Sequence, residues 1–237
     1  MIIHWKPSYT ASCVHIARWA LAADPYDAIS EPFQATAQTL STALSQLAPA
    51  EEQAPWALLQ RSAIEANNAD ELVLRLPSGW SSTPSFCKAL QGLLGKVSSQ
   101  YPDLAEQLPA RVRPLREQWE ARAPGFLRVL QQELGAAAEK PLTLGLVTPV
   151  LGGYGAACGE GSAVIEAVLY HPVPTVPEPV RVGWLVAKHI GKPQADSSNR
   201  CDSRLLLGAV QRAAHCVEWL SANVRPEDLA AAWSLEI

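Results

Sequence analysis

The chain has 237 residues, of which 48% are hydrophobic and 18% are charged, and its formal net charge is −4. This composition is typical of a globular protein with a sizeable core and excludes a disordered chain. The acidic balance gives no reason to expect nucleic acid as a partner. The arginines between residues 111 and 128 alternate with glutamates, as on a solvated helix face.

The start of the chain, Met1 to Pro7, has no basic segment followed by an apolar core, so we expect no secretory signal. No apolar run approaches the ~20 residues that span a bilayer. The five cysteines are odd in number, widely spread and without a C-x-x-C pair, which is typical of a reducing compartment. We therefore expect a soluble, cytoplasmic protein with no membrane partner.

Hydrophobic periodicity predicts a helix-rich first half. A short strand is expected at His4 and Trp5, and the alternation over Glu71–Leu76 predicts a second strand. Pro124 and Gly125 should kink or restart the last helical stretch of this half. We expect helices over residues 10–23, from the N-cap candidate Ser30 to Leu47, and over residues 54–67, 83–99, 114–122 and 124–138.

The stretch from Pro141 to Ile190 organises the second half. It predicts a strand over 142–150, a glycine-rich crossing over 151–162, a strand over 163–170 and a helix over 179–190. Because this helix has no broad polar face, we expect it to be buried at the centre of the fold. A polar loop, a long helix from Ser203 and a short helix ending near Trp233 follow.

These elements predict a helix-rich α+β fold in which a small mixed sheet packs against several helices. We see no internal repeat or low-complexity linker, and we expect a single domain over residues 1–237. Within it, residues 1–68 form a helical N-terminal part and residues 69–237 an α+β core.

The glycine-rich crossing is the most unusual composition in the chain. Its spacing matches neither G-x-G-x-x-G nor the P-loop, and a strand, not a helix, is expected after it, so we expect no nucleotide. A flexible hairpin or bulged edge explains the glycines. We propose this region as a binding surface, with the candidate residues Gly152, Gly153, Tyr154, Gly155, Cys158, Glu160 and Val168.

Cys158 is a candidate nucleophile if a histidine approaches it, because a thiolate needs a base or a positive field. The nearest histidines in sequence are His171 and His189, and no family signature surrounds the cysteine. A small residue in a tight loop explains it equally well. Glu160 and Glu166 flank the crossing, but nothing in the sequence fixes their separation, so an acid–base pair is not supported.

Metal binding would need ligands spaced to face one ion, such as two histidines four residues apart. The sequence offers no such pair, so we expect neither a metal nor another cofactor. The residues considered were Cys13, His15, His189, Cys201, His215, Cys216 and Glu218.

Trp80, within Pro77-Ser-Gly-Trp-Ser-Ser-Thr83, is the tryptophan most available for binding on a loop. The alternative, a tryptophan that closes the edge of the core, is favoured for this residue type.

The order of elements over residues 70–220 resembles the zincin metallopeptidases. It runs strand, helices, strand, glycine-rich crossing, strand, buried helix and long helix. In that family the buried helix carries H-E-x-x-H and the strand before it borders the substrate cleft. Here the helix reads Pro-Val-Arg-Val-Gly-Trp-Leu-Val-Ala-Lys-His-Ile, without the two imidazoles and the glutamate that activate a zinc-bound water. The resemblance implies a scaffold without that chemistry.

Three functions remain open on the sequence. The leading hypothesis is a non-catalytic protein-binding module, in which Ala163–Tyr170 is a free sheet edge that accepts a partner strand around Val168. The alternative is a hydrolase that uses Cys158 or a degenerate zincin-like scaffold. A third is a subunit of a larger assembly, and the expected partner is protein, either another copy of the chain or a different one.

Overall fold

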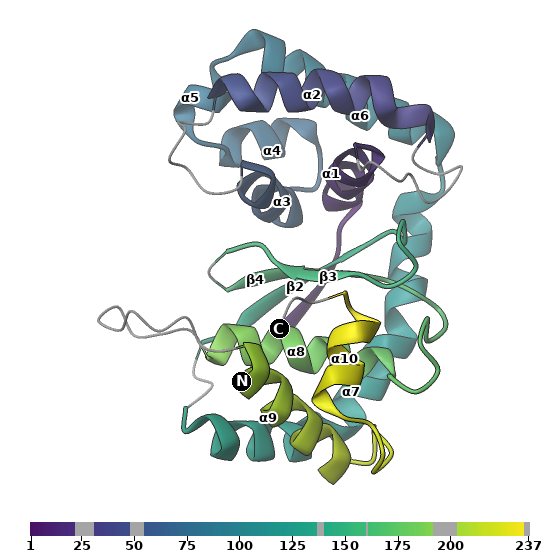
Figure 1. Ribbon diagram of the computed structural model, residues 1–237. Helices are drawn as coiled ribbons and strands as arrows, with labels where there is room; N and C mark the ends of the chain where they lie inside the picture. The colour runs from purple at the N-terminus through teal and green to yellow at the C-terminus, as the bar shows by residue number, and fades with distance from the viewer. Residues whose placement is uncertain (22–30, 48–54, 137–139, 160, 192–202, 235–237) are drawn as a thin grey trace.

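The computed structural model describes residues 1–21, 31–47, 55–136, 140–159, 161–191 and 203–234 (Figure 1). One four-stranded sheet has the order β1-β2-β4-β3, in which β1, β2 and β4 are parallel and the edge strand β3 is antiparallel. The strands are β1 (Ile3–Pro7), β2 (Leu142–Val147), β3 (Gly155–Ala157) and β4 (Ser162–Glu166). The predicted α+β class with a small mixed sheet is confirmed.

Helices make up most of the remaining structure. In chain order they are α1 (Tyr9–Ala20), the 3₁₀ turn η1 (Glu31–Phe33), α2 (Gln34–Leu47), α3 (Pro55–Glu65), α4 (Ala69–Arg75), α5 (Ser78–Ser81), α6 (Pro84–Gln100), α7 (Leu104–Leu134), α8 (Glu178–Ile190), α9 (Ser203–Cys216) and α10 (Pro226–Ala232). Within the described ranges, no helix combines the length and the apolar character that crossing a membrane requires.

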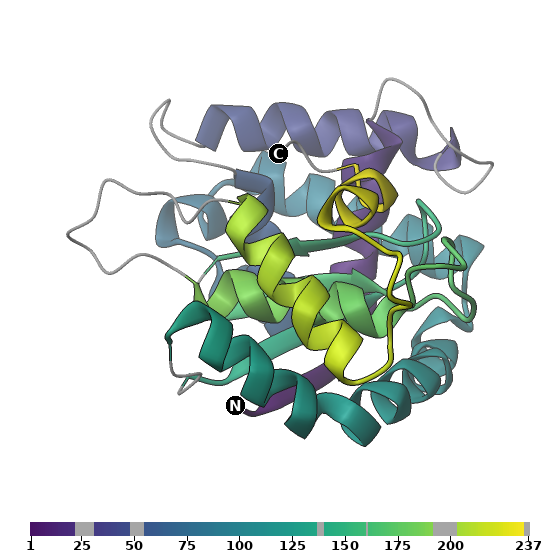
Figure 2. The same cartoon turned by 60° about the horizontal axis from the view of Figure 1, so that its bottom comes forward.

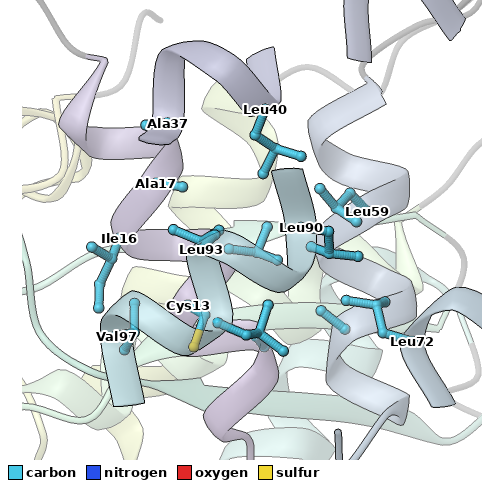
Figure 3. Close-up of a cluster of buried hydrophobic side chains, with 14 of the residues drawn as sticks. Cys13, Ile16, Ala17, Ala37, Leu40, Leu59, Leu72, Leu90, Leu93 and Val97 are labelled. Carbon is cyan, nitrogen blue, oxygen red and sulfur yellow. The ribbon is translucent and has the colours of Figure 1, made fainter. Parts of the chain in front are cut away.

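The sheet lies between two helical layers (Figure 1). Helices α1 to α6 lie on one face, α8 to α10 lie on the other, and α7 runs past the sheet from one layer to the other. Each face buries its own apolar cluster, and residues of β2 and β4 alternate between the two clusters as the strand period of two requires. Figure 3 shows the first cluster, where Cys13, Leu90 and Leu93 meet between α1 and α6.

Helix α8 is the centre of the second cluster, between the sheet and α9 (Figure 2). Ten of its residues are buried, from Glu178 to Ala187, so the prediction of a buried helix over 179–190 is confirmed. Strand β4, which precedes α8 in the chain, ends at Glu166. The sequence predicted that this strand would continue four residues further, to Tyr170.

The predicted strand over 71–76 is wrong, because this segment belongs to helix α4. Leu72 and Leu76 are buried and lie four residues apart, whereas Leu74 between them is 84% exposed. On a strand all three leucines would share one face. Here Leu72 and the C-cap residue Leu76 turn to the core while Leu74 turns to solvent, as the helical turn between them requires. The side chain of Asn68 caps the helix by accepting from the Glu71 amide at 2.9 Å.

The sequence predicted either a kink or a new helix start at Pro124. The new start is wrong, because α7 continues from Leu104 to Leu134 with three prolines inside it. Trp119 and Phe126, on either side of Pro124, are both buried in the second cluster with ring centroids 5.5 Å apart. Packing within the second cluster therefore holds the helix together where proline removes a backbone hydrogen bond, and α7 changes direction along its length (Figures 1 and 2).

Candidate functional site

The loop over residues 148–154 passes above the end of β4, where one buried carboxylate holds it. The amides of Val150 and Leu151 donate to Oε1 of Glu166 at 2.7 and 2.8 Å, and the Gly153 amide donates to Oε2 at 2.7 Å. The fourth contact comes from α1, where His15 Nε2 lies 2.8 Å from Oε1. We call Glu166, His15 and these three amides the loop anchor.

The loop anchor is buried, with Glu166 0% and His15 1% exposed. Burial by itself would raise the pKa of Glu166. The hydrogen bond and charge of His15, with the amides of Leu151 and Val150, instead lower this pKa below its ordinary value of 4.5. The carboxylate is therefore ionised at neutral pH, and both of its oxygens are occupied by donors that position the loop.

Beside the anchored loop lies a pocket of about 730 Å³, within the range of small-molecule and peptide sites. One wall is the chain from Leu151 to Ala157, which contains β3. A second wall is α8, and Trp19, Pro172 and the segment 232–234 with Trp233 complete the lining. We call this the β3–α8 pocket.

The edge strand β3 presents unpaired backbone groups to its surroundings. In an antiparallel ladder, directly opposite residues alternate between pairs that exchange hydrogen bonds and pairs that do not. The Glu166 amide donates to the Tyr154 carbonyl at 2.8 Å, so Tyr154 and the residues two steps away face β4. Gly155 and Ala157 therefore direct their N–H and C=O groups away from the sheet, and no described residue hydrogen-bonds to them.

The close contact between β3 and α8 depends on glycine. A Cβ atom at Gly155 would lie 3.2 Å from Cδ of Arg181 and 3.3 Å from Cδ1 of Leu185. At Gly153, where φ is +134°, a Cβ atom would lie 2.6 Å from Cγ of Pro172. Small residues thus bring the strand and the helix together along one side of the pocket.

Two cations of α8 line the pocket and differ in their pairing. Arg181 is 5% exposed, its Nε lies 3.1 Å from Oε2 of Glu178, and its guanidinium lies 5.5 Å from the Trp233 ring centroid. Lys188 is exposed, and its Nζ lies 5.2 Å from the ring centroid of Trp184. Among the described residues no carboxylate pairs with Lys188, so its charge faces the pocket without a counter-ion.

Aromatic rings join the loop anchor to the pocket. The ring of Tyr154 lies 5.6 Å from the ring of His15 and 5.0 Å from that of Trp19, measured between centroids. Arg18 lies 5.6 Å from the Trp19 ring centroid. The side of the pocket formed by Tyr154 and Trp19 is therefore aromatic and packs against α1.

The structure brings four of the predicted binding residues together and separates others. Gly152, Gly153, Tyr154 and Gly155 line the β3–α8 pocket. Val168 lines a different pocket of about 480 Å³, with Ile16, Tyr101 and Tyr170 among its neighbours. Glu160 lies outside the described residues.

The hypothesis of a free edge at Ala163–Tyr170 is wrong. β4 pairs with β2 on one side and with β3 on the other, because the glycine-rich crossing folds back and adds a strand. The free edge beside the glycines is that of β3.

Trp80 is not available on a loop. It lies on α5 and is 3% exposed, and its ring centroid lies 5.8 Å from that of Phe86. Trp80 is therefore part of the first cluster.

The structure provides no activation for Cys158. The residue is buried at 3% exposure, and its thiol is 3.7 Å from the carbonyl oxygen of Ala156. Burial raises the pKa of this thiol to about 12, although the charge of Arg18 acts against the rise. At neutral pH Cys158 is therefore a protonated core thiol.

Two other histidines considered for metal binding, beside His15 of the loop anchor, have separate backbone partners. His189 Nε2 lies 3.3 Å from the Lys140 carbonyl oxygen, and His215 Nε2 lies 3.2 Å from that of Val224. Within the described ranges, no three His, Cys, Asp or Glu side chains are grouped to hold a metal ion. Cys201 lies outside these ranges.

The element order that resembles zincins loses its first strand, since residues 69–75 are helical. The side of α8 that lines the pocket carries Arg181, Trp184, Leu185 and Lys188.

Sequence reasoning missed the loop anchor and the α8 residues of the pocket. One signal was present: Glu166 and His15 are each a titratable residue within an apolar stretch, and such groups are seldom buried without a partner. The pairing itself spans 151 positions in the chain, so no local pattern announces it. Comparison of the chain with protein-family models, with curated proteins and with solved structures found no match in any of the three.

Proposed function

We propose that this protein binds an extended segment of a partner protein, which adds to the sheet as a fifth strand beside β3. The observation that carries the proposal is the outward direction of the backbone groups of Gly155 and Ala157 along the wall of a pocket. An added strand takes its affinity from such main-chain hydrogen bonds and its selectivity from pockets for alternate side chains.

The two edges of the sheet differ in a way that favours β3. The outer strand β1 ends in Lys6 and Pro7, and charge and proline are devices that protect an edge from pairing. β3 carries only Gly155, Ala156 and Ala157, which leave room for a neighbouring chain. Its ends are held by the loop anchor and by the Cys158 amide, which donates to the Ser162 carbonyl at 2.9 Å.

The contacts favour this binding role over the hydrolase alternative. Cys158 is a buried, protonated thiol, and the α8 side chains in the pocket include no histidine or carboxylate. The two oxygens of Glu166 already accept four hydrogen bonds in the loop anchor.

The test begins with random octapeptides displayed on phage and selected on the wild-type protein. Selected peptides are then titrated against Ala157→Pro, which removes one outward N–H and no hydrogen bond of the sheet. We expect about tenfold weaker binding, the effect of one lost hydrogen bond whose acceptor stays unpaired. Ala157→Val retains the N–H and is the matched control.

A second measurement does not depend on how the proline variant folds. Backbone N-methylation of a selected peptide at alternate positions should abolish binding in one register and leave it intact in the other, because only alternate amides face β3. Equal binding of both methylated series, or of the valine and proline variants in their folded state, would overturn the proposal.

A further inference from the structure

The β3–α8 pocket has two chemically different positions on the side that faces α8. Side chains directly opposite each other on neighbouring strands point to the same face of a sheet. Gly155 lies against α8, whereas Ala156 packs against the first cluster on the α1 side. A partner residue opposite Gly155 or opposite Ala157 would therefore direct its side chain toward α8, and the residue between them toward α1.

The direction of α8 decides which of its side chains each position meets. Gly153 and Gly155 lie against Arg181, and Gly155 also lies against Leu185. At the other end of the helix, His189 contacts the Lys140 carbonyl, just before the start of β2. That end of the sheet is also where Ala157 pairs with Ala163. Helix α8 thus runs along β3 in the same sense, with Lys188 toward the Ala157 end.

These two positions offer a cation and an apolar surface. Toward Ala157 the pocket presents the ammonium group of Lys188, which no described carboxylate neutralises. Toward Gly155 it presents Leu185. The rings of Trp184 and Trp233, whose centroids lie 6.2 Å apart, also line the pocket, with Trp233 beside Arg181 and Trp184 beneath the Lys188 ammonium group. The guanidinium of Arg181 is already occupied by Glu178.

We propose that the pocket selects extended peptides in which a carboxylate side chain lies two residues from an apolar side chain. The carboxylate pairs with Lys188, and the apolar side chain packs against Leu185, Trp184 and Trp233. The spacing of two follows from the pleat of a strand added beside β3, and the charge preference follows from the ammonium group of Lys188, which has no carboxylate partner among the described residues. This inference rests on the function proposed above.

The experiment repeats the octapeptide selection on wild type, Lys188→Glu and Trp233→Ala. On wild type we expect Asp or Glu to be enriched two positions from an apolar residue. Replacing that acid by alanine should weaken binding about fivefold, as for a partly exposed ion pair. On Lys188→Glu, the enrichment should change to Lys or Arg at the same position. On Trp233→Ala, the acid preference should persist while the apolar preference is lost.

Lys96→Glu is the matched control, because Lys96 also lies over an aromatic ring, 5.8 Å from the centroid of Phe33, but in the other helical layer. It should leave the selected sequences unchanged. If binding remains sensitive to Ala157→Pro but shows no acid preference, or if Lys188→Glu leaves that preference unchanged, the charge selection is refuted and strand addition stands. If no selected peptide distinguishes Ala157→Pro from Ala157→Val, both proposals fail.

Discussion

At the scale of single residues, Glu166 joins parts of the chain that are far apart in sequence. It lies at the end of β4 and joins α1 to the loop that leads into β3, so the position of the candidate site depends on one side chain. Moving a charged carboxylate from water into the protein interior costs free energy, and four hydrogen-bond donors offset this cost. These donors stabilise the ionised form, so their contribution is lost when the group is protonated. The residue is therefore both a structural constraint and a point of sensitivity to acid.

The change Glu166→Gln should lower the free energy of unfolding at about pH 7 by about 3 kcal/mol, because an amide cannot accept from all four donors. Since the folded pKa of Glu166 lies below 4.5, its contribution is complete above that pH and is lost as the pH falls through the lower folded value. Urea titrations across this range should show the difference between wild type and variant narrowing toward acid.

The partly exposed pair Lys6–Glu65, at 3.4 Å, supplies the control for that experiment. Glu65→Gln should cost less than about 1 kcal/mol, as expected of a surface ion pair. A Glu166→Gln effect that is small, or constant from neutral to acid pH, would contradict the role assigned to the loop anchor.

At the scale of elements, α8 shows how a helix can contact both a sheet and two other helices. It contacts β3 on one side and α7 and α9 on others, and its apolar residues share the second cluster with those of β2 and β4. Gly183 lets α7 approach, since a Cβ atom there would lie 2.4 Å from Cζ of Phe126. The same helix carries the pocket residues, so its packing sets the width of the site.

Gly183→Ala should therefore destabilise the protein by about 1–3 kcal/mol, the usual cost of overpacking a core. This result opposes intrinsic helix propensity, which favours alanine over glycine by about 1 kcal/mol. Gly92→Ala in α6 is the matched control, because nothing lies within 4 Å of the added Cβ atom, and it should stabilise. The midpoint temperatures of thermal unfolding of both variants test this prediction. A Gly183→Ala variant more stable than wild type would contradict it, because α7 would then move away from the added methyl group without loss of stability.

At the scale of the whole molecule, the sheet joins two apolar clusters that lie on its opposite faces. The first strand pairs with β2, so that Ile3 lies beside Leu142, and His15 pairs with Glu166. Contacts between distant parts of the chain thus complete both the sheet and the site. We expect the two clusters to unfold together, in line with the single domain predicted over residues 1–237.

Leu90→Ala and Leu207→Ala test this expectation from the two sides of the sheet. Both leucines are fully buried, one in each cluster, and each change should cost about 3 kcal/mol through lost contacts and a cavity. Urea unfolding followed by tryptophan fluorescence and by circular dichroism should show one shifted transition with an unchanged slope in both variants. Two separate transitions in either variant would mean that the layers are independent domains.

The sequence alone determined those features that repeat over short distances. Apolar side chains on nearly all sides of residues 179–190 predicted a buried helix. The glycines among residues 152–155 indicated the part of the chain that forms the pocket wall. Local patterns suffice here because burial of a whole helix and close approach of a backbone leave their mark in consecutive residues.

Only the tertiary structure decided which strand is free and which charges meet. β4 was expected to be an edge, but the crossing folds back as β3 and covers it. Leu72, Leu74 and Leu76 alternate as in a strand, yet only Leu72 and Leu76 are buried, and Pro124 lies inside a helix that packing maintains. The pairings of Glu166 with His15 and of α8 with β3 join residues remote in the chain. Their physical cause is the burial of charge and the closure of the sheet, which no local pattern contains.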